Sequence, residues 1–433
     1  MTTSMEQVIR PVVQDWVPCL TAPQYRQLTR WVLGAVLAGS ANGPSMIQAL
    51  TTAGIAGVST LTDQWEQWLA QAAHQTTDPP VEDRPVVVSP LAIGAALLRV
   101  ILDWWPDDRL ILGMDASLRR DDVVLLRMSV LYRGTALPIG WVMVPATTPG
   151  AWAPHWDRLL AWAATVLDAQ RLVVVVTDRG LWSPQLWHSI QRHGWHPVMR
   201  VQAHATFRPR GQARQPVRDL VLSPGSGWIG HGTAFKDASK RLEGTLAVVW
   251  DEGANEPWAL LTDLPPRMMD PAWYALRMWD EEGFRASTSM GWHWQRGQLD
   301  DPDAVAWQDV VVAVATLWTL AVGTRIEDAQ QMGVPPSQVR TPPTTTPRRT
   351  RRSGTAHRVV SLLVQGMQTL RRLWTRGRTW LRLWLRPEPW PKMIDRWRVH
   401  IHTPSSSRKT LLVPPLSDYS LPTSFPSHFP MLG

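Results

Sequence analysis

The chain has 433 residues, of which 44% are hydrophobic, and a formal net charge of +8. Its length allows two or three domains with a large core, and its composition excludes a wholly disordered protein. The single cysteine, Cys19, excludes an internal disulfide and indicates a reducing compartment. The first residues lack the basic stretch and apolar core of a secretory signal, so we expect no signal peptide.

Positive charge is concentrated near the C-terminus. Residues 341–400 hold 13 Arg and one Lys against Glu388 and Asp395, a net charge of +12, and the last 33 residues add +1. Residues 1–340 therefore carry about −5. A basic segment favours polyanions, although a solvated tail explains the charge equally well. We predict that residues 331–433 form a Pro-rich linker at Thr341–Pro347, a basic helix at Arg358–Leu385 and a disordered tail. The interleaved Arg and Trp residues of this extension favour DNA as its partner over a protein or membrane surface.

The N-terminal part has the apolar spacing of helices. Residues 21–74 show this period with a break at Gly39–Pro44, and Leu91–Trp105 shows it again after a polar linker at His74–Pro85. Short helices separated by turns are typical of a helix-turn-helix DNA-binding unit, but any small helical bundle gives the same pattern. We assign residues 1–105 to a helical domain that is a candidate for DNA binding.

From Arg109 the pattern changes to strands. We predict three successive strands, a helix, an all-apolar strand and another helix, at Leu110–Met114, Asp122–Tyr132, Thr135–Val144, Trp152–Ala169, Leu172–Thr177 and Pro184–His193. This order indicates an α/β fold with a mixed sheet flanked by helices, in which the fourth strand lies beside the first. Residues 106–202 would form the first part of this core.

The core is interrupted before it is completed. Residues 203–268 are rich in glycine and contain strands at Leu246–Trp250 and Trp258–Thr262, which predicts a mostly β insertion. Helices at Pro271–Ser287 and Asp303–Gly323 would complete the core over residues 269–330. The apolar run Val310–Gly323 has about 14 residues, too few to span a bilayer. We expect a buried helix and no membrane partner.

Three acidic residues form a candidate metal site. Asp115 and Asp178 each follow an apolar strand, and Glu281 lies on the helix predicted at Pro271–Ser287. Hard carboxylate oxygens suit Mg²⁺ or Mn²⁺, and two such ions can both activate a water and stabilise a leaving oxygen at a phosphodiester. No Cys/His pattern of a zinc site is present. For Asp178 alone, capping of the next helix is an equally good explanation.

The residues around Glu281 and Asp178 resemble a known family. Tyr274-x2-Arg277-x3-Glu281, followed by Phe284 and Arg285, is similar to the Y-x2-R-x3-E-x6-K signature of the hairpin-forming branch of bacterial insertion-sequence transposases. Thr177-Asp178-Arg179-Gly180 resembles the block around the second aspartate of that branch. The resemblance runs from about residue 20 to 330 and implies a ribonuclease H-like catalytic domain with a DDE triad.

The resemblance also implies roles for individual residues. Asp115, Asp178 and Glu281 would be the catalytic triad that holds two Mg²⁺ or Mn²⁺ ions. Tyr274, Arg277, Arg285 and Thr288 would contact DNA, with Tyr274 and Arg277 at the phosphate near the cleavage point. Thr288 departs from the family, which has lysine there. Arg277 and Glu281 are also spaced as a simple i, i+4 ion pair.

The resulting hypothesis is a transposase that binds the ends of its element, cleaves them and joins them to target DNA. It would act as a homodimer on double-stranded DNA, in the bacterial cytoplasm and at the nucleoid when bound. Two alternatives stay open. One is an inactive or repurposed DNA-binding protein derived from such an enzyme, motivated by Thr288 and the basic extension. The other is a ribonuclease H-like nuclease that cuts without joining.

Overall fold

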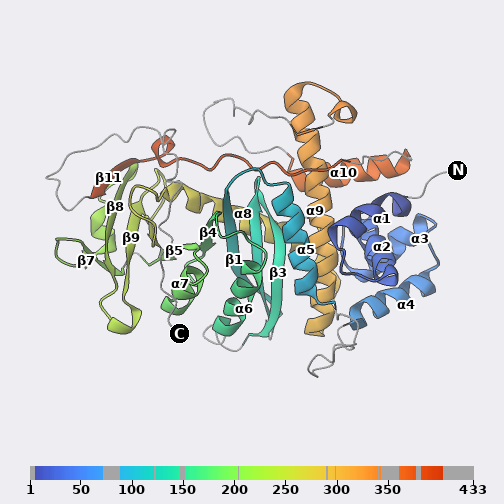
Figure 1. The fold of residues 1–433 in the computed structure, drawn as a ribbon, viewed down its shortest axis with the longest axis horizontal. Helices are drawn as coiled ribbons and strands as arrows, with labels where there is room; N and C mark the ends of the chain where they lie inside the picture. The colour runs from blue at the N-terminus through green and yellow to red at the C-terminus, as the bar shows by residue number, and fades with distance from the viewer. Residues whose placement is uncertain are drawn as a thin grey trace, which may run out of the picture.

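Five N-terminal helices pack around one long central helix, α9 (Pro302–Met332). The structure, a computed structural model, describes residues 5–71, 88–120, 123–146, 152–202, 204–288, 291–297, 299–339, 341–342, 360–376 and 382–402. The five helices are α1 (Met5–Trp16), α2 (Ala22–Ala38), α3 (Gly43–Thr52), α4 (Val58–Leu69) and α5 (Pro90–Asp103). α1 to α4 form the end of the molecule opposite the β insertion, and α5 lies between the sheet and α9 (Figure 1). Trp68 of α4 is fully buried and donates from Nε1 to the Trp307 carbonyl.

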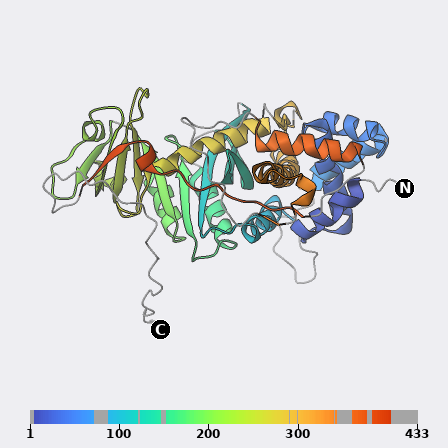
Figure 2. The same cartoon turned by 90° about the horizontal axis from the view of Figure 1, so that it is seen from above.

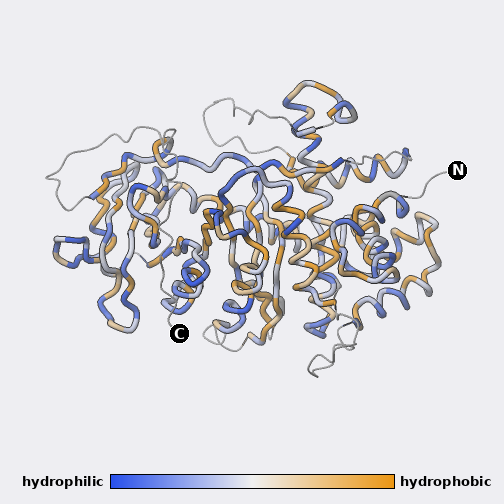
Figure 3. The backbone as a smooth tube through the Cα atoms, viewed as in Figure 1, coloured by the Kyte–Doolittle hydropathy of each residue, from blue (hydrophilic) through white to orange (hydrophobic). Residues whose placement is uncertain are grey.

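Helix α9 is long and apolar enough to cross a membrane if length and composition alone are considered. However, 94% of its most apolar window is buried inside the molecule. Its hydrophobic surface runs between the sheet and the N-terminal helices in Figure 3. This is the environment of a core helix, as the sequence predicts, although the helix extends nine residues beyond Gly323.

The sheet is mixed, with the order β3-β2-β1-β4-β5-β10-β9-β8-β6-β7 and β11 beside β8. β1 pairs antiparallel with β2 and parallel with β4, which confirms that the fourth strand lies beside the first. The mixed α/β class predicted from the sequence is therefore correct. The strands of the first half are β1 (Arg109–Arg120), β2 (Val123–Tyr132), β3 (Thr135–Pro145), β4 (Leu172–Thr177) and β5 (His196–Val201).

Alternating residues of β1 and β4 face two different cores. Leu110, Leu112 and Met114 face the core that contains α5, α6 (Ala153–Ala164) and α9. Ile111, Val174 and Val176 face a second core, formed by the 3-10 turn η5 (Pro271–Arg277) and by residues of the C-terminal segment.

α8 (Met278–Thr288) continues directly from η5, so the predicted helix Pro271–Ser287 exists but begins as a tighter turn. Figure 2 shows α8 running from the β insertion towards α10.

The inserted segment extends the sheet rather than forming a separate layer. Its strands are β6 (Thr206–Pro209), β7 (Gln215–Pro216), β8 (Ser226–Ala234), β9 (Leu242–Val249) and β10 (Trp258–Thr262). β10 pairs with β5 and thereby joins the insertion to the core. The two strands predicted within this segment correspond to β9 and β10.

The C-terminal extension is ordered at residues 360–376, where a helix lies within the predicted range, and at residues 382–402, where the expectation of a disordered extension is wrong. α10 (Leu362–Thr375), shorter than the helix expected at Arg358–Leu385, packs so closely on α9 that a Cβ at Gly366 would lie 1.9 Å from the Thr319 carbonyl oxygen. Residues 382–402, which we call the strap, then cross to the insertion, where β11 (Arg398–His402) pairs parallel with β8 (Figure 1). The linker predicted at His74–Pro85, most of that at Thr341–Pro347 and residues 403–433 lie outside the described residues.

Tryptophans and paired arginines account for the order of this extension. Trp384, Trp390 and Trp397 are each at most 9% exposed. Arg386 is buried against Asp328, and Arg396 pairs with Asp251 at 2.7 Å. The interleaved Arg and Trp residues of the strap therefore serve intramolecular packing, which the sequence did not distinguish from DNA binding.

We predict that Trp390→Ala destabilises the whole core. The Trp390 ring contacts Trp273 of η5 at 4.9 Å between centroids, and loss of a buried tryptophan costs about 3–5 kcal/mol. Urea unfolding should show this loss, whereas Ile394→Ala, at a side chain that is 54% exposed on the same strap, should change the unfolding free energy by less than about 0.5 kcal/mol. Equal stability of the two variants would contradict the docking of the strap.

Candidate active site

Asp270 connects the strap to the helix that carries the predicted glutamate. Its Oδ1 accepts a hydrogen bond from the Ala272 backbone N–H at 2.9 Å and so caps η5. Its Oδ2 accepts from the Met393 N–H of the strap at 3.0 Å. One buried carboxylate therefore fixes the start of η5 and holds the strap against it, which sets the position of α8.

Strand alternation directs the two aspartates toward that helix. The last paired residues of β1 and β4 are Met114 and Thr177, so Asp115 and Asp178 come next on both strands. They have the same parity as Ile111 and Val176, whose side chains face η5. β1 continues through Asp115 to Arg120, so this aspartate lies within the strand and not at its end as expected. The two are nevertheless brought together as the sequence predicts.

The three predicted acids, which we call the acid cluster, surround one guanidinium group. Arg277 Nη1 donates to Glu281 Oε1, one helical turn further on. Arg277 Nη2 lies 3.7 Å from Asp115 Oδ1 and 3.9 Å from Asp178 Oδ2. The i, i+4 ion pair considered from the sequence is thus present, and the same arginine also reaches both aspartates.

Asp178 closes the turn after β4 and does not cap the next helix, whereas its role as a metal ligand stays a prediction. Its Oδ1 accepts hydrogen bonds from Gly180 N at 2.6 Å and Leu181 N at 3.1 Å, which closes the turn after β4. α7 (Pro184–Gln191) has its own cap, Ser183. The turn therefore occupies one carboxylate oxygen of Asp178, and the other faces Arg277.

A fourth acid, Asp280, lies beneath the acid cluster and was not chosen from the sequence. It is 1% exposed, lies 3.7 Å from Arg127 Nη2, and has no hydrogen-bond partner on either carboxylate oxygen within the described structure. Arg127 is the cross-strand neighbour of Asp115. Of the consecutive acids Asp280, Glu281 and Glu282, only Glu281 pairs with Arg277. Asp280 lies beside Arg127, and Glu282 pairs with Arg285. Because Arg127 lies directly opposite Asp115 on the neighbouring strand, its side chain points to the same face of the sheet. This strand pairing is the sequence signal that could have revealed the buried pair of Arg127 and Asp280.

Burial and mutual repulsion disfavour full ionisation of the site. Burial, followed by the negative charge of Asp280, raises the pKa of Asp115 to about 7, although Arg277 and Arg127 oppose the shift. Burial also raises the pKa of Asp280 and lowers that of Arg127. Four carboxylates with only two arginines create a demand for further positive charge.

The residues expected to hold DNA are bound within the protein. The Tyr274 hydroxyl is buried and donates to the Thr177 carbonyl at 3.1 Å, and burial raises its pKa to about 12. The Thr288 hydroxyl donates to the Phe284 carbonyl at 3.0 Å. Arg285 is exposed and pairs with Glu282 at 3.0 Å. Phosphate contact by these three side chains stays a prediction and would require each to exchange its present partner.

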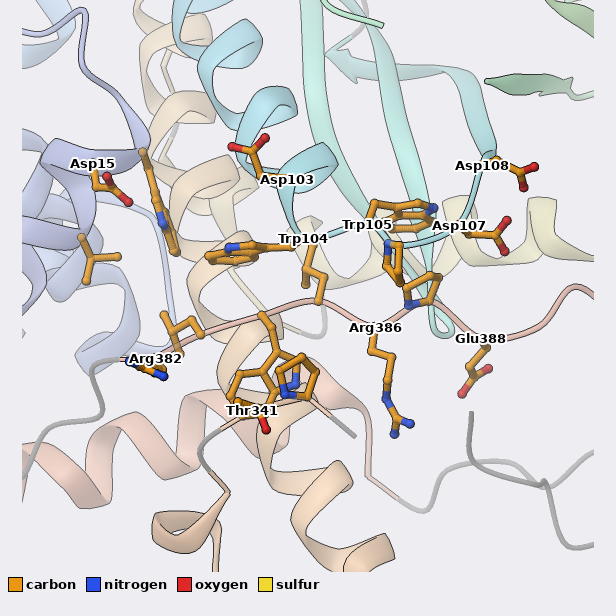
Figure 4. Close-up of a pocket in the computed structure, with 18 of the residues that line it drawn as sticks. Asp15, Asp103, Trp104, Trp105, Asp107, Asp108, Thr341, Arg382, Arg386 and Glu388 are labelled. Carbon is orange, nitrogen blue, oxygen red and sulfur yellow. The ribbon is translucent and has the colours of Figure 1, made fainter. Parts of the chain in front are cut away.

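The acid cluster does not form a ready metal cage within the described part of the chain. Among the described residues, no three His, Cys, Asp or Glu side chains are grouped closely enough to hold a metal ion. Arg277 lies where the three carboxylates meet. A cavity of about 1370 Å³ lies elsewhere, between α1, the end of α5 and the strap, and includes Trp104, Asp107 and Arg386 in its lining (Figure 4).

We predict that Asp115→Asn changes how stability depends on pH. With a folded pKa of about 7, Asp115 keeps a proton that the unfolded chain has lost, so its ionisation destabilises the protein as pH rises from about 4 to 7. The asparagine variant should therefore gain stability relative to the native protein between pH 5 and 8, by on the order of 2 kcal/mol. Urea unfolding in EDTA measures this; Asp168→Asn, at an exposed position, should show no such gain.

No family model and no curated protein matches the chain. Among solved structures, the catalytic domain of human Endonuclease V is similar over 63% of this chain and 98% of its own length, with 14% identity and a TM-score of 0.23. A TM-score this low identifies neither the fold family nor the activity of this chain.

Proposed function

We propose that the protein is a DDE transposase with a ribonuclease H-like core, which cleaves the ends of its element and joins them to target DNA. The observation that carries the proposal is the convergence of Asp115, Asp178 and Glu281 on one guanidinium. These residues come from two neighbouring parallel strands and from a helix 103 residues beyond Asp178. The Y-x2-R-x3-E resemblance selects the same acids from the sequence alone.

The arrangement of the core supports the fold part of the proposal. The strand that carries Asp115 is central, with an antiparallel neighbour on one side and the parallel strand that leads to Asp178 on the other. Helices cover the sheet, and the β insertion separates the second aspartate from the glutamate. Both features agree with the branch that the sequence resembles.

The donor set of the acid cluster fits divalent metal. Asp115, Asp178 and Glu281 offer the hard oxygens that these ions prefer. When bound by these three residues, two Mg²⁺ or Mn²⁺ ions would activate a water and stabilise the leaving oxygen. The turn from Gly180 to Leu181 fixes Asp178 and β1 fixes Asp115, but the three side chains must move closer together to hold metal, since in their described positions they form no metal site.

Arg277 would exchange its partners during the reaction. Its guanidinium can bind a phosphate oxygen pair as a fork, but now it is shared among three carboxylates. As it turns to a DNA phosphate, it frees carboxylate oxygens for metal. Tyr274 keeps the backbone beside it in place through Thr177. The homodimer on paired ends remains part of the proposal and follows from the resemblance.

One observation favours the alternative of an inactive DNA-binding descendant. Thr288 replaces the lysine of the family signature, and its hydroxyl donates a hydrogen bond to the Phe284 carbonyl within the helix. The site therefore lacks one cation that would hold the cleaved end. The experiment below separates this alternative from the transposase.

We predict that Asp115→Asn and Asp178→Asn each lower Mg²⁺- or Mn²⁺-dependent cleavage at least about 100-fold. Asparagine keeps the size of the side chain but removes the charge that holds metal. The substrate is a DNA fragment carrying the flanks of this gene, and the readout is nicked and joined products on a sequencing gel. Binding of the fragment in EDTA should be unchanged.

The matched control for this prediction is Asp168→Asn. Asp168 is exposed and precedes β4, whereas Asp178 follows the other end of the same strand. The control variant should cleave as the native protein does. Binding without cleavage by the native protein would establish the inactive alternative, and cleavage without strand transfer from a pre-cut end would establish the nuclease.

We predict that Arg277→Gln binds Mn²⁺ several-fold more tightly while cleaving DNA poorly. Removal of the guanidinium ends its competition for the three carboxylates but also removes a phosphate ligand. Calorimetric titration with Mn²⁺ in the absence of DNA measures the first effect. Arg192→Gln, an exposed arginine paired with Asp157, should leave Mn²⁺ affinity unchanged. Weaker Mn²⁺ binding by Arg277→Gln would contradict the competition.

A further inference from the structure

The acid cluster cannot attract DNA by itself. Its three carboxylates share Arg277, and Arg127 pairs with Asp280 beneath them, so the cluster offers a phosphate no free positive charge until metal is bound. The arginines nearby are engaged with acids: Arg179 and Arg200 share Glu256, which leaves one positive charge in excess, and Arg285 pairs with Glu282. Affinity for a duplex therefore requires positive charge on another surface that adjoins the site.

The β insertion carries such a surface, which we call the basic edge. It consists of Arg208, Arg214, Lys236, Lys240 and Arg241, of which only Arg214 is partly buried. Arg208 lies opposite Thr233 in the β6–β8 ladder, and Arg214 Nη1 lies 3.3 Å from Thr206 Oγ1 and 3.4 Å from the Thr233 carbonyl oxygen. Arg241 Nη2 donates to the Lys236 carbonyl at 3.3 Å. These contacts gather the ends of β6 and β8 with the β8–β9 turn.

The charges of the basic edge are only partly compensated, by Asp237, which is attracted to Lys240 and Arg241. None of its five side chains takes part in an ion pair with another described residue at 4.0 Å or less. The nearby acids are Asp237, whose Oδ1 accepts from Ser239 N, and Glu243, which lies opposite Thr233 in the β8–β9 ladder. Residues 204–243 hold seven Lys and Arg against three Asp and Glu, although residues 1–340 as a whole are negative.

A ring stack joins the basic edge to the turn that holds Asp178. Trp182, four residues beyond Asp178, stacks on Phe235 with centroids 4.4 Å apart and an interplanar angle of 6°. Phe235 directly precedes Lys236 and has a φ of +62°, a conformation that costs a non-glycine residue energy unless its surroundings hold it. The β8–β9 turn is therefore held against the turn that follows Asp178. A ligand bound to one of these turns lies close to the other.

We propose that the basic edge binds the sugar-phosphate backbone of double-stranded DNA next to the acid cluster. Five unpaired cations on one edge suit the regularly spaced phosphates of a duplex, and release of the counterions drives the association. The choice of DNA over another polyanion rests on the proposed function. The binding itself requires neither metal nor cleavage.

The test is the salt dependence of binding by the full-length protein in EDTA. A fluorescein-labelled 30-bp DNA duplex is titrated by anisotropy at several NaCl concentrations, with native protein and with Lys236→Gln/Lys240→Gln. Each lost phosphate contact lowers the slope of log K against log[NaCl] by about 0.9. We expect the slope to fall by up to about 1.8 and the affinity at 0.1 M NaCl to fall about tenfold or more.

The matched control is Arg158→Gln/Arg192→Gln, which removes two exposed positive charges on α6 and just after α7. It should keep the native slope. Equal slopes for the two double variants would overturn the inference. A fall in slope for Lys236→Gln/Lys240→Gln with an RNA duplex of the same sequence, but not with DNA, would also overturn it. If the slope falls while no protein cleaves DNA, the basic edge stands and the proposed function fails; if Asp178→Asn abolishes cleavage while slopes are equal, the reverse holds.

Discussion

The contact of one guanidinium, that of Arg277, with three carboxylates is the interaction on which the site depends. Without a cation among them, Asp115, Asp178 and Glu281 would repel one another across the junction of β1, β4 and α8. Arg127 compensates Asp280 in the same way one layer deeper. The two arginines thus allow a sheet and a helix, both bearing acids, to pack together. The chemistry of the site and the stability of this junction are therefore coupled.

The strap extends this coupling to the far end of the chain. Met393 binds Asp270, which caps η5, and Trp390 packs on Trp273 of the same turn. At its other end β11 completes the edge of β8, the strand that leads to the basic edge. One C-terminal segment therefore contacts both the helix that carries Glu281 and the sheet of the insertion.

Much of the central sheet could be predicted from the sequence because strand periodicity is local. Leu172–Thr177 is predicted to the residue, and the two aspartates follow from their apolar strands. Asp280 was missed because its burial depends on Arg127, 153 residues away in the sequence. The strap was missed because its tryptophans bury only against residues distant in sequence, and local composition shows arginine and proline instead. The motif at Tyr274 could not reveal that its hydroxyl donates to the Thr177 carbonyl, because that contact spans 97 residues of sequence.

The parallel pairing of β11 with β8 has a consequence for the order of events during synthesis. Residues 398–402 pair with residues 226–230, so this contact forms only after nearly all of the described chain has left the ribosome. The hydrogen bond from Met393 to Asp270 is equally late. A nascent or prematurely terminated chain would present both aspartates and the glutamate, but its helix would lack half of its anchoring at Asp270. The strap contacts that surround the acidic residues therefore form after the residues themselves have been synthesised.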